Sequence, residues 1–338
     1  MKAFLHILQD ILDNGTDWLG NRTDKRTKKV HFREFRHWLK DGYPLLTTKK
    51  VNPKTIFIEL EGFLKGIRSK KWYQERGCFI WDEWCNPEVI KNYDFDDLPK
   101  LAEQLVHESM INKYDITKKI RKSLDKIIES FIPNPVSGHM EMPENADNEK
   151  YHTMLREHIQ LVEDDLGPIY GCQWRDRNGV DQLANAINML KENPLDRRII
   201  VDAWAPEDLH KMALPPCHWS FEIHSDGESF DLKWNQRSVD TFLGLPFNIA
   251  SYAMLMLLIE KETGLVAGEL VGGLGDVHIY ENHQEQVNTQ LSREPRELPK
   301  VKVTVPEGKE FSIFEWTHED YEITDYNPHP FIKAEVAV

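Results

Sequence analysis

The chain has 338 residues, of which 40% are hydrophobic and 29% are charged, and this balance excludes an intrinsically disordered protein. Its formal net charge of −14 argues against a general nucleic-acid surface, because such surfaces neutralise phosphates with many Lys and Arg side chains. No apolar run reaches the length of about 20 residues that crosses a bilayer, so no membrane partner is expected.

The first part of the chain is predicted to be helical. Five apolar residues recur at helical spacing, and they predict a first helix that ends near Gly15: Phe4, Ile7, Leu8, Ile11 and Leu12. The stretch TIFIELEGFLKGI is apolar on one helical side and carries Glu59 and Glu61. Amphipathic patterns at about 98–106 and 120–131 precede a Pro-rich acidic loop, which predicts a helical insertion at about 86–165.

The second part of the chain, from Gly167, is predicted to hold strands and one long helix. RRIIVDAW is a run rich in β-branched residues, and WSFEIHSDGESFDLKWNQ predicts a hairpin around Asp226 and Gly227. IASYAMLMLLIEKETG predicts a buried helix that stops at Gly264. Because strands and helices do not alternate regularly, we expect one α+β domain over 1–338, with a mixed or antiparallel sheet and helices on one face.

A thiol follows two prolines in MALPPCHWSFEIH, where Cys217 precedes a predicted strand. A cysteine among apolar residues is usually an inert buried side chain. Arginines in NRTD (Arg22), DRRII (Arg197 and Arg198) and NQRSVD (Arg237) offer the alternative. If they converge on Cys217, they would bind a phosphate and lower the pKa of the thiol from about 8.5, which makes it a nucleophile.

Three further polar residues are candidates for recognising a small molecule. Asn248 in LPFNIASYA either pairs with a flat heterocycle through its amide or caps the following helix. In GDVHIYENH, His278 and Tyr280 would lie on one face of a strand, where both could hydrogen-bond a hydroxyl.

No metal site is expected. The spacing of His278 and His283 suits neither one helix face nor an H-x-x-x-H pattern. The four cysteines also lack the spacing of metal ligands: Cys78, Cys85, Cys172 and Cys217. The scattered thiols and an amphipathic start that is unlike a signal peptide together predict a reducing, cytoplasmic location.

An ordered series of these stretches resembles the thymidylate synthase family. The series is NRT, DGYPLLTTKK, IWDEW, LGPIYGCQWR, DRRIIV, MALPPCH, QRSVDTFLGLPFNIASYA, GDVHIY, QLSREPRELP and YNPHPFIKAEVAV. It covers nearly the whole chain outside 86–165. The resemblance implies a thymidylate synthase-like fold whose sheet lies at a dimer interface with helices on its other face, and hence a homodimer.

The resemblance also implies the reaction and a nucleotide site. The Cys217 thiolate would attack C6 of the uracil of dUMP, so that C5 can accept a one-carbon unit from the co-substrate 5,10-methylenetetrahydrofolate. The products would be dTMP and dihydrofolate. The nucleotide site would comprise Arg22, Arg237 and Ser238 at the phosphate, Arg197 and Arg198 reaching the same phosphate from the partner subunit, Gln236 and Asn248 at the base, and His278 and Tyr280 at the ribose hydroxyl.

The remaining matched positions concern proton transfer and folate. Glu59 would organise water and pass protons near uracil O4, and Tyr170 would lie near C5, where a proton has to leave. The folate side would comprise Trp81, Trp84, Leu214, Asp240 and Phe247, with Val338 at the end of a C-terminal segment that closes over it. Cys217, Glu59, Tyr170, Arg237 and Asp240 form the expected catalytic group.

Two departures from the family pattern keep a second product open. Glu61 and Gly62 stand where the family has an apolar residue and a tryptophan, and Asn235 stands where a tyrosine is usual. Polar groups near the methylene site could hold a water, which would give 5-hydroxymethyl-dUMP and tetrahydrofolate, as in viral pyrimidine nucleotide hydroxymethylases. They could equally be unrelated to the site. The retained C-terminus and Trp81 favour the methyl product.

Two rival classes are also considered. A cysteine hydrolase could pair Cys217 with His218, although neighbours on a strand face opposite ways. A non-catalytic nucleotide-binding protein could use the insertion to dock a partner.

Overall fold

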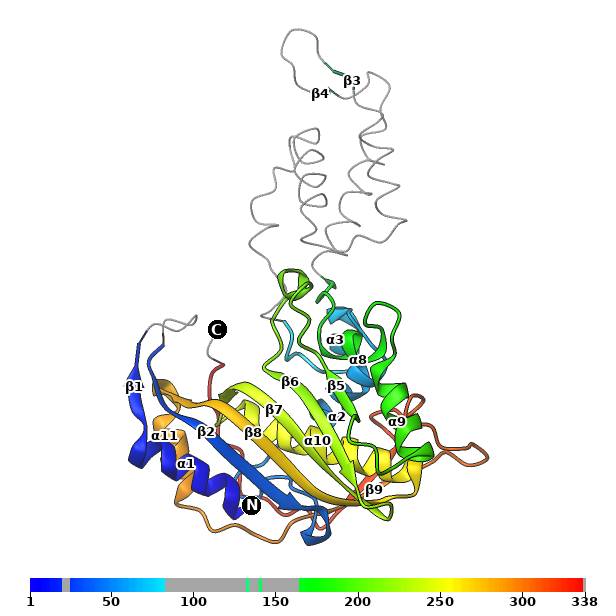
Figure 1. Ribbon diagram of the computed structural model, residues 1–338. Coiled ribbons are helices and arrows are strands. Elements are labelled where there is room, and N and C mark those ends of the chain that lie inside the picture. The colour runs from blue at the N-terminus through cyan, green and yellow to red at the C-terminus, as the bar shows by residue number, and fades with distance from the viewer. Residues whose placement is uncertain (20–24, 83–131, 134–139, 142–163, 337–338) are drawn as a thin grey trace. The chain divides into compact units, whose positions relative to one another are not determined.

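A computed structural model of the chain describes residues 1–19, 25–82, 132–133, 140–141 and 164–336 (Figure 1). The chain divides into two compact units. Unit 1 comprises Met1–Ile67, Tyr170–Trp204 and Pro216–Val338, and unit 2 comprises Arg68–Ile169 and Ala205–Pro215. Most of the predicted insertion at 86–165, including both of its expected helices, lies outside the described residues, so the insertion stays a prediction.

Unit 1 is built on a six-stranded sheet. Its strands are β1 (Thr16–Trp18), β2 (Thr27–Trp38), β5 (Ile200–Asp202), β6 (His218–Ser225), β7 (Ser229–Asp240) and β8 (Val266–Tyr280), in the spatial order β1-β2-β8-β7-β6-β5. Neighbours pair antiparallel except β7 and β8, which are parallel. The mixed sheet confirms the predicted α+β class. The strand predicted at RRIIVDAW covers only Ile200–Asp202, and both arginines precede it.

The parallel pair depends on α10 (Gly244–Thr263), because parallel neighbours need a crossover that returns the chain to the same end of the sheet. Figure 1 shows this helix running along the back of the sheet, behind β6, β7 and β8 in that view. Twelve of its residues are buried, since apolar side chains occur all round it. It ends at Gly264, whose φ of 81° is the left-handed stop that the sequence predicted.

The hairpin between β6 and β7 forms where Asp226 and Gly227 predicted it. Asp226 Oδ1 accepts hydrogen bonds from the backbone N–H groups of Glu228 (2.9 Å) and Ser229 (2.7 Å). Gly227 has a φ of 96°, a conformation that side chains with a β-carbon rarely adopt. This turn fixes the register of the two strands that carry Cys217 and Arg237 at their other ends.

The remaining elements of unit 1 are α1 (Lys2–Asn14), η1 (Leu39–Asp41), α2 (Pro53–Leu64), α8 (Tyr170–Arg175), α9 (Gln182–Glu192), η3 (Glu281–His283), α11 (Gln284–Leu291), β9 (Lys300–Val303) and β10 (Tyr321–Thr324). Unit 2 holds α3 (Lys70–Glu75), β3 (Ile132–Pro133), β4 (Met140–Glu141) and η2 (Leu209–Lys211). The first helix ends just before Gly15, as expected. Within the described ranges, no helix combines the length and apolar character that a bilayer crossing requires.

Candidate active site

The thiol-bearing residue lies at the start of β6, tied on both sides by its backbone. The N–H of Cys217 donates to the hydroxyl oxygen of Tyr170 (2.8 Å), and its carbonyl accepts from the N–H of Arg237 (2.8 Å). Cys217 itself is partly exposed, so it is not the inert core cysteine of the first alternative. The stiff turn after Pro215 and Pro216 therefore presents a thiol at an accessible position that two neighbouring elements hold in place.

Tyr170 connects this thiol to the core. It is the first residue of α8, is 3% exposed, and stacks on the rings of Phe63 (4.9 Å) and His218 (4.3 Å). Burial raises the pKa of Tyr170 well above its ordinary value, and the charges of Cys217 and Glu59 act in the same direction. The phenol therefore remains protonated at neutral pH.

Glu59 faces the same region because α2 and α8 pack at very short range. Gly171 follows Tyr170, and a β-carbon at this position would overlap the backbone of Phe63 on α2. Only glycine allows this approach, which brings the helix that carries Glu59 against the helix that carries Tyr170. Glu59 is 8% exposed, so its carboxyl group is largely shielded from water.

Glu61 points away from Glu59, which favours the alternative that Glu61 is unrelated to the site over the alternative that it holds a water near the methylene site. Two residues along an α-helix turn the side chain by about 200°, to the other side. There Glu61 accepts hydrogen bonds from Lys65 Nζ (2.6 Å) and from the backbone N–H and ring Nδ1 of His318 (3.0 and 2.7 Å). Its carboxylate is therefore fully engaged within the chain.

Asn235 is likewise engaged within the chain. Its Nδ2 donates to Ser220 Oγ (3.1 Å) across the β6–β7 pair. Successive side chains alternate between the two faces of a strand, so Asn235 and Gln236 point to opposite faces of β7.

Asn248 belongs to a chain of amide hydrogen bonds whose direction is fixed. The indole Nε1–H of Trp234 can only donate, and it donates to Gln236 Oε1 (3.1 Å). The other side of that amide, Gln236 Nε2, then donates to Asn248 Oδ1 (3.1 Å). The amide of Asn248 is thereby oriented with its oxygen toward Gln236.

The helix-cap alternative for Asn248 is wrong. Helix α10 begins at Gly244, so Asn248 lies inside its first turns. Asp240 Oδ1 accepts hydrogen bonds from the N–H groups of Phe242 and Leu243 (3.1 Å each), and so orders the turn that leads into the helix.

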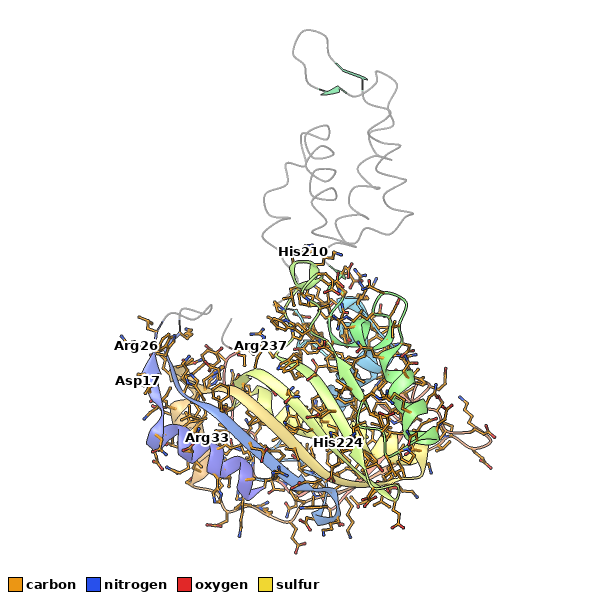
Figure 2. All side chains as sticks on the ribbon, in the orientation of Figure 1. Asp17, Arg26, Arg33, His210, His224 and Arg237 are labelled. Carbon is orange, nitrogen blue, oxygen red and sulfur yellow. The ribbon has the colours of Figure 1, made fainter. Side chains whose placement is uncertain are left out.

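Arg237 is the arginine that the structure brings to Cys217. Its Nε donates to the carbonyl oxygen of Pro216 (2.9 Å), and its guanidinium lies 5.4 Å from the ring of Trp204. In Figure 2, Arg237 and His224 mark opposite ends of the β6–β7 hairpin. The exposed Arg237 therefore lies at the end of the hairpin where Cys217 directly precedes β6. Ser238 follows it, half-buried, on β7.

The other predicted arginines are placed differently. Arg197 and Arg198 are exposed in the segment before β5, and Arg198 forms a two-pronged ion pair with Asp196 (2.9 and 2.6 Å). Arg22 lies outside the described residues.

The predicted sugar-binding pair lies at the end of β8. His278 and Tyr280 point to the same face, with ring centroids 5.0 Å apart, and His278 is opposite Asp240 in the β7–β8 register. Phe247 lies half-buried near the start of α10. The end of β8, the end of β7 and the start of α10 thus bring His278, Tyr280, Asp240 and Phe247 to one region.

Two buried polar residues near this region were given no role from the sequence, where His283 was considered only as a metal ligand and rejected. Lys49 donates to the carbonyl oxygen of Phe242, and its Nζ lies 3.5 Å from the centroid of that ring. Burial lowers the pKa of Lys49 to about 7, against the attraction of Asp240. His283 is fully buried, and its Nε2 donates to the carbonyl oxygen of Glu335 (2.7 Å). The sequence could have indicated Lys49, because it is a lysine inside the motif TTKK. It could not have indicated the role of His283, because its partner Glu335 is distant in sequence.

The other predicted folate residues lie in unit 2 or outside the described part. In unit 2, Trp81 is 3% exposed and Leu214 is half-buried. Trp84 and Val338 lie outside the described residues.

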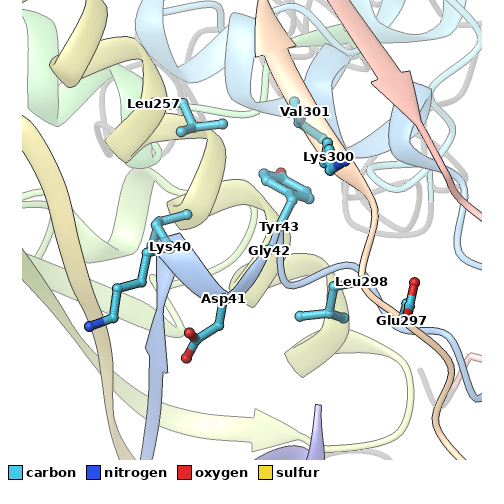
Figure 3. A pocket seen from close by; sticks show the side chains of 10 residues that line it. Lys40, Asp41, Gly42, Tyr43, Leu257, Glu297, Leu298, Lys300 and Val301 are labelled. Carbon is cyan, nitrogen blue, oxygen red and sulfur yellow. The ribbon is translucent and has the colours of Figure 1, made fainter.

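A pocket of about 500 Å³ lies elsewhere in unit 1, and Figure 3 shows its lining. It is formed by η1, Leu257 of α10 and the segment from Glu297 to Val301, and it includes none of the predicted site residues.

The hydrolase alternative conflicts with the geometry of His218. Its ring is buried, is stacked on Tyr170, and shares a hydrogen bond between Nδ1 and the hydroxyl of Tyr252 (2.9 Å). Burial lowers the pKa of His218 to about 3. A buried imidazole with so low a pKa is a poor proton acceptor for a thiol at neutral pH.

Comparisons with known proteins agree with the sequence pattern. A family model described as Thymidylate synthase matches residues 2–338. A thymidylate synthase from Mycoplasma mobile is 39% identical over 338 residues, and one from Mycoplasma genitalium is 38% identical over 338 residues. Both alignments cover all of this chain and all of the relative.

Proposed function

Because the chain belongs to the thymidylate synthase family, we propose that the Cys217 thiolate adds to C6 of dUMP during the methylation of dUMP to dTMP. Addition of sulfur to C6 places the electron pair on C5, which then attacks the one-carbon unit. The observation that carries this proposal is the geometry of Cys217, which is partly exposed, is tied to Tyr170, and lies beside Arg237.

The nucleotide would be held from three directions: at its phosphate, at its base, and at its sugar hydroxyl, which His278 and Tyr280 bind from the end of β8. Arg237 and Ser238, with Arg22, bind the 5′-phosphate, which suits the exposed guanidinium next to Cys217. Asn248 reads O4 and N3 of uracil, because its amide can donate from Nδ2 while Oδ1 still has a second lone pair beside the bond from Gln236.

Proton transfer falls to the two buried groups that flank Cys217. Glu59 exchanges protons with O4 through water, and Tyr170 lies where the C5 proton leaves. Support for this division is that Glu59 and Tyr170 come from two helices in direct contact, and that Tyr170 touches the backbone of Cys217. Both groups work with little water around them, where a small shift in position changes proton affinity strongly.

The co-substrate is 5,10-methylenetetrahydrofolate, which supplies the one-carbon unit and the hydride that gives the methyl product. Residues of this chain fit such a molecule: Phe247 offers an apolar surface for a ring system, and Asp240 offers a carboxylate acceptor for pterin N–H groups. Trp81, Trp84 and Leu214 would add apolar contact. Val338 would close the site and keep water from the reacting carbon.

The methyl product is favoured over the hydroxymethyl product by the positions of the two unusual polar residues. A hydroxymethylase needs a water held beside the one-carbon unit. The carboxylate of Glu61 is bound by Lys65 and His318, and Asn235 is bound to Ser220 on the opposite face from Gln236. Neither residue is placed to hold that water.

A homodimer completes the site in this proposal. Arg197 and Arg198 are exposed before β5, and they would reach the phosphate in the partner subunit. A second copy with the same exposed pair would complete both sites by symmetry.

The test is product analysis with dUMP and 5,10-methylenetetrahydrofolate. The expected result is a nucleotide heavier by one methyl group, with dihydrofolate seen by its absorbance. Cys217→Ala should abolish turnover and leave dUMP binding measurable, whereas the matched control Cys78→Ala, which changes a buried thiol in unit 2, should retain turnover. A hydroxymethyl gain without dihydrofolate would show the other product, and turnover by the Cys217 variant would remove the proposed nucleophile.

A further inference from the structure

Three side chains on β2 and β8 form a hydrogen-bonded row that ends at the proposed sugar-binding histidine. Lys29 Nζ lies 2.7 Å from Asp276 Oδ2, and Asp276 Oδ1 lies 2.9 Å from His278 Nδ1. Lys29 is directly opposite His278 in the β2–β8 register, and Asp276 precedes His278 by two residues on the same face. The Lys29 and His278 side chains are only 13% and 9% exposed, whereas the Asp276 carboxylate between them is 34% exposed, so the two outer members are largely buried and the middle one is partly open to water.

The middle member of this row is ionised. Burial alone would raise the pKa of Asp276, but the hydrogen bonds from His278 and Lys29 lower it to about 2. An ionised carboxylate can only accept hydrogen bonds, so the proton between the two residues belongs to His278 Nδ1. In a neutral imidazole the other nitrogen, Nε2, then carries a lone pair and acts as an acceptor.

Lys29 determines which carboxylate oxygen of Asp276 faces His278. Its ammonium can only donate, and it engages Oδ2 of Asp276, which leaves Oδ1 for His278. The ring of Trp18 lies 4.5 Å from Nζ and holds the ammonium from a third strand, β1. A histidine whose second nitrogen is fixed by a carboxylate has one orientation and one tautomer.

We propose that Asp276, held by Lys29, is a positioning residue that fixes the tautomer of His278, so that Nε2 accepts a hydrogen bond from the sugar and the site selects nucleotides with a 3′-hydroxyl. This inference rests on the proposed function, in which His278 and Tyr280 bind the sugar. A 5′-phosphorylated deoxyribonucleotide has only the 3′-hydroxyl to offer. That hydroxyl donates to His278 Nε2 and can still accept from a second donor such as Tyr280.

The first test compares kcat/KM for dUMP and for 2′,3′-dideoxyuridine monophosphate. The wild-type chain should prefer dUMP by about tenfold, the value of one hydrogen bond. In Asp276→Asn, Lys29 attracts the amide oxygen and turns the amide NH₂ toward His278, which reverses the tautomer. The preference should then fall to roughly twofold, even if kcat for dUMP also falls.

The matched control is Glu269→Gln. Glu269 forms an ion pair with Arg36 (2.5 Å) between the same two strands, far along the register from His278. This variant should keep the full preference for dUMP. If Asp276→Asn slows both nucleotides by the same factor, Asp276 is merely structural and the inference is wrong. If the wild-type chain itself shows no preference, the sugar-binding role of His278 fails instead.

A second test reads the tautomer directly. The ¹⁵N shifts of His278, assigned with His278→Gln, should show a protonated Nδ1 in the wild-type chain and a protonated Nε2 in Asp276→Asn. A wild-type Nε2–H tautomer would overturn the inference whatever the chain's activity. Should Asp276→Asn not fold, Lys29→Met should lower the preference for dUMP to about threefold, and an unchanged tenfold preference would count against the proposal.

Discussion

The hydroxyl oxygen of Tyr170 accepts the backbone N–H of Cys217 at 2.8 Å, so the tyrosine fixes the main chain at the residue that bears the thiol. Both the position of the thiol and the removal of the proton from C5 would therefore depend on one hydroxyl group. Arg237 holds the carbonyl side of the same residue. The turn after Pro216 is thus fixed from two elements, α8 and β7.

Tyr170→Phe should lower kcat by about a hundredfold or more, because it removes both the hydroxyl proposed to lie where the C5 proton leaves and the partner of a half-buried N–H. The ring stays in its stack on Phe63 and His218, so the loss of unfolding free energy should be only about 1 kcal/mol. Steady-state kinetics and thermal melts measure the two effects. A wild-type kcat in this variant would remove Tyr170 from the proposed proton transfer.

Asn248→Asp should shift the preferred base from uracil toward cytosine. A carboxylate keeps the acceptor that Gln236 needs but loses the donor for O4, and it can accept from the amino group of cytosine. We expect the kcat/KM ratio of dUMP to dCMP to fall by roughly ten- to a hundredfold, in line with other pairs of hydrogen bonds to a base edge. An unchanged ratio would show that Asn248 does not read the base.

Trp234→Phe should weaken uracil recognition without touching the nucleotide. Its Nε1–H is the donor that sets the amide of Gln236, and Gln236 in turn orients Asn248. Without it, the amide of Gln236 is held only on its Nε2 side, by the carbonyl oxygen of Ser238 (3.0 Å) and by Asn248, so KM for dUMP should rise several-fold while kcat changes less. Gln236→Glu should be worse, since a carboxylate oxygen would face Asn248 Oδ1. If Trp234→Phe lowers the melting temperature but leaves KM unchanged, the indole is only a core residue.

The hairpin at Asp226 and Gly227 and the stop of α10 at Gly264 were predictable because each depends on a few consecutive residues. The parallel pairing of β7 and β8 was not, since it depends on where the whole of α10 packs. Asn248 shows the same limit. Local sequence allowed a helix cap at Asn248, but α10 begins at Gly244, before that residue.

The candidate site also has some features that the sequence could predict and others that it could not. Cys217, Arg237 and Asn248 were identifiable by residue type and motif, and the structure adds the hydrogen bonds that orient them. Helical periodicity alone places Glu61 on the side of the helix opposite Glu59. The sequence could therefore have shown that Glu61 does not hold a water beside Glu59. Its partner His318 lies 257 residues away and could not be found from the sequence.

Mixing two inactive variants should restore activity if the partner subunit completes the site. Cys217→Ala lacks the nucleophile, and a chain with Arg197→Ala and Arg198→Ala lacks the arginines proposed to cross the interface. After subunit exchange, half of the dimers are mixed, and each mixed dimer holds one complete site of two. We therefore expect about a quarter of the wild-type activity. No recovery, with exchange verified by mass spectrometry, would argue against crossing arginines.

Glu61→Gln should destabilise the fold at neutral pH but much less in acid. Burial alone would raise the pKa of Glu61, but hydrogen bonds from Lys65 and His318 outweigh it and hold the pKa below the ordinary value of 4.5. The folded state therefore binds its proton less readily than the unfolded chain, and the stabilisation is complete above pH 4.5 and is lost as pH falls through the lower, folded pKa. Urea unfolding should show the wild-type chain more stable by roughly 1–3 kcal/mol at pH 7, with the gap narrowing in acid. A gap that stays constant from pH 7 into acid would mean that the carboxylate charge contributes nothing to the contact with His318.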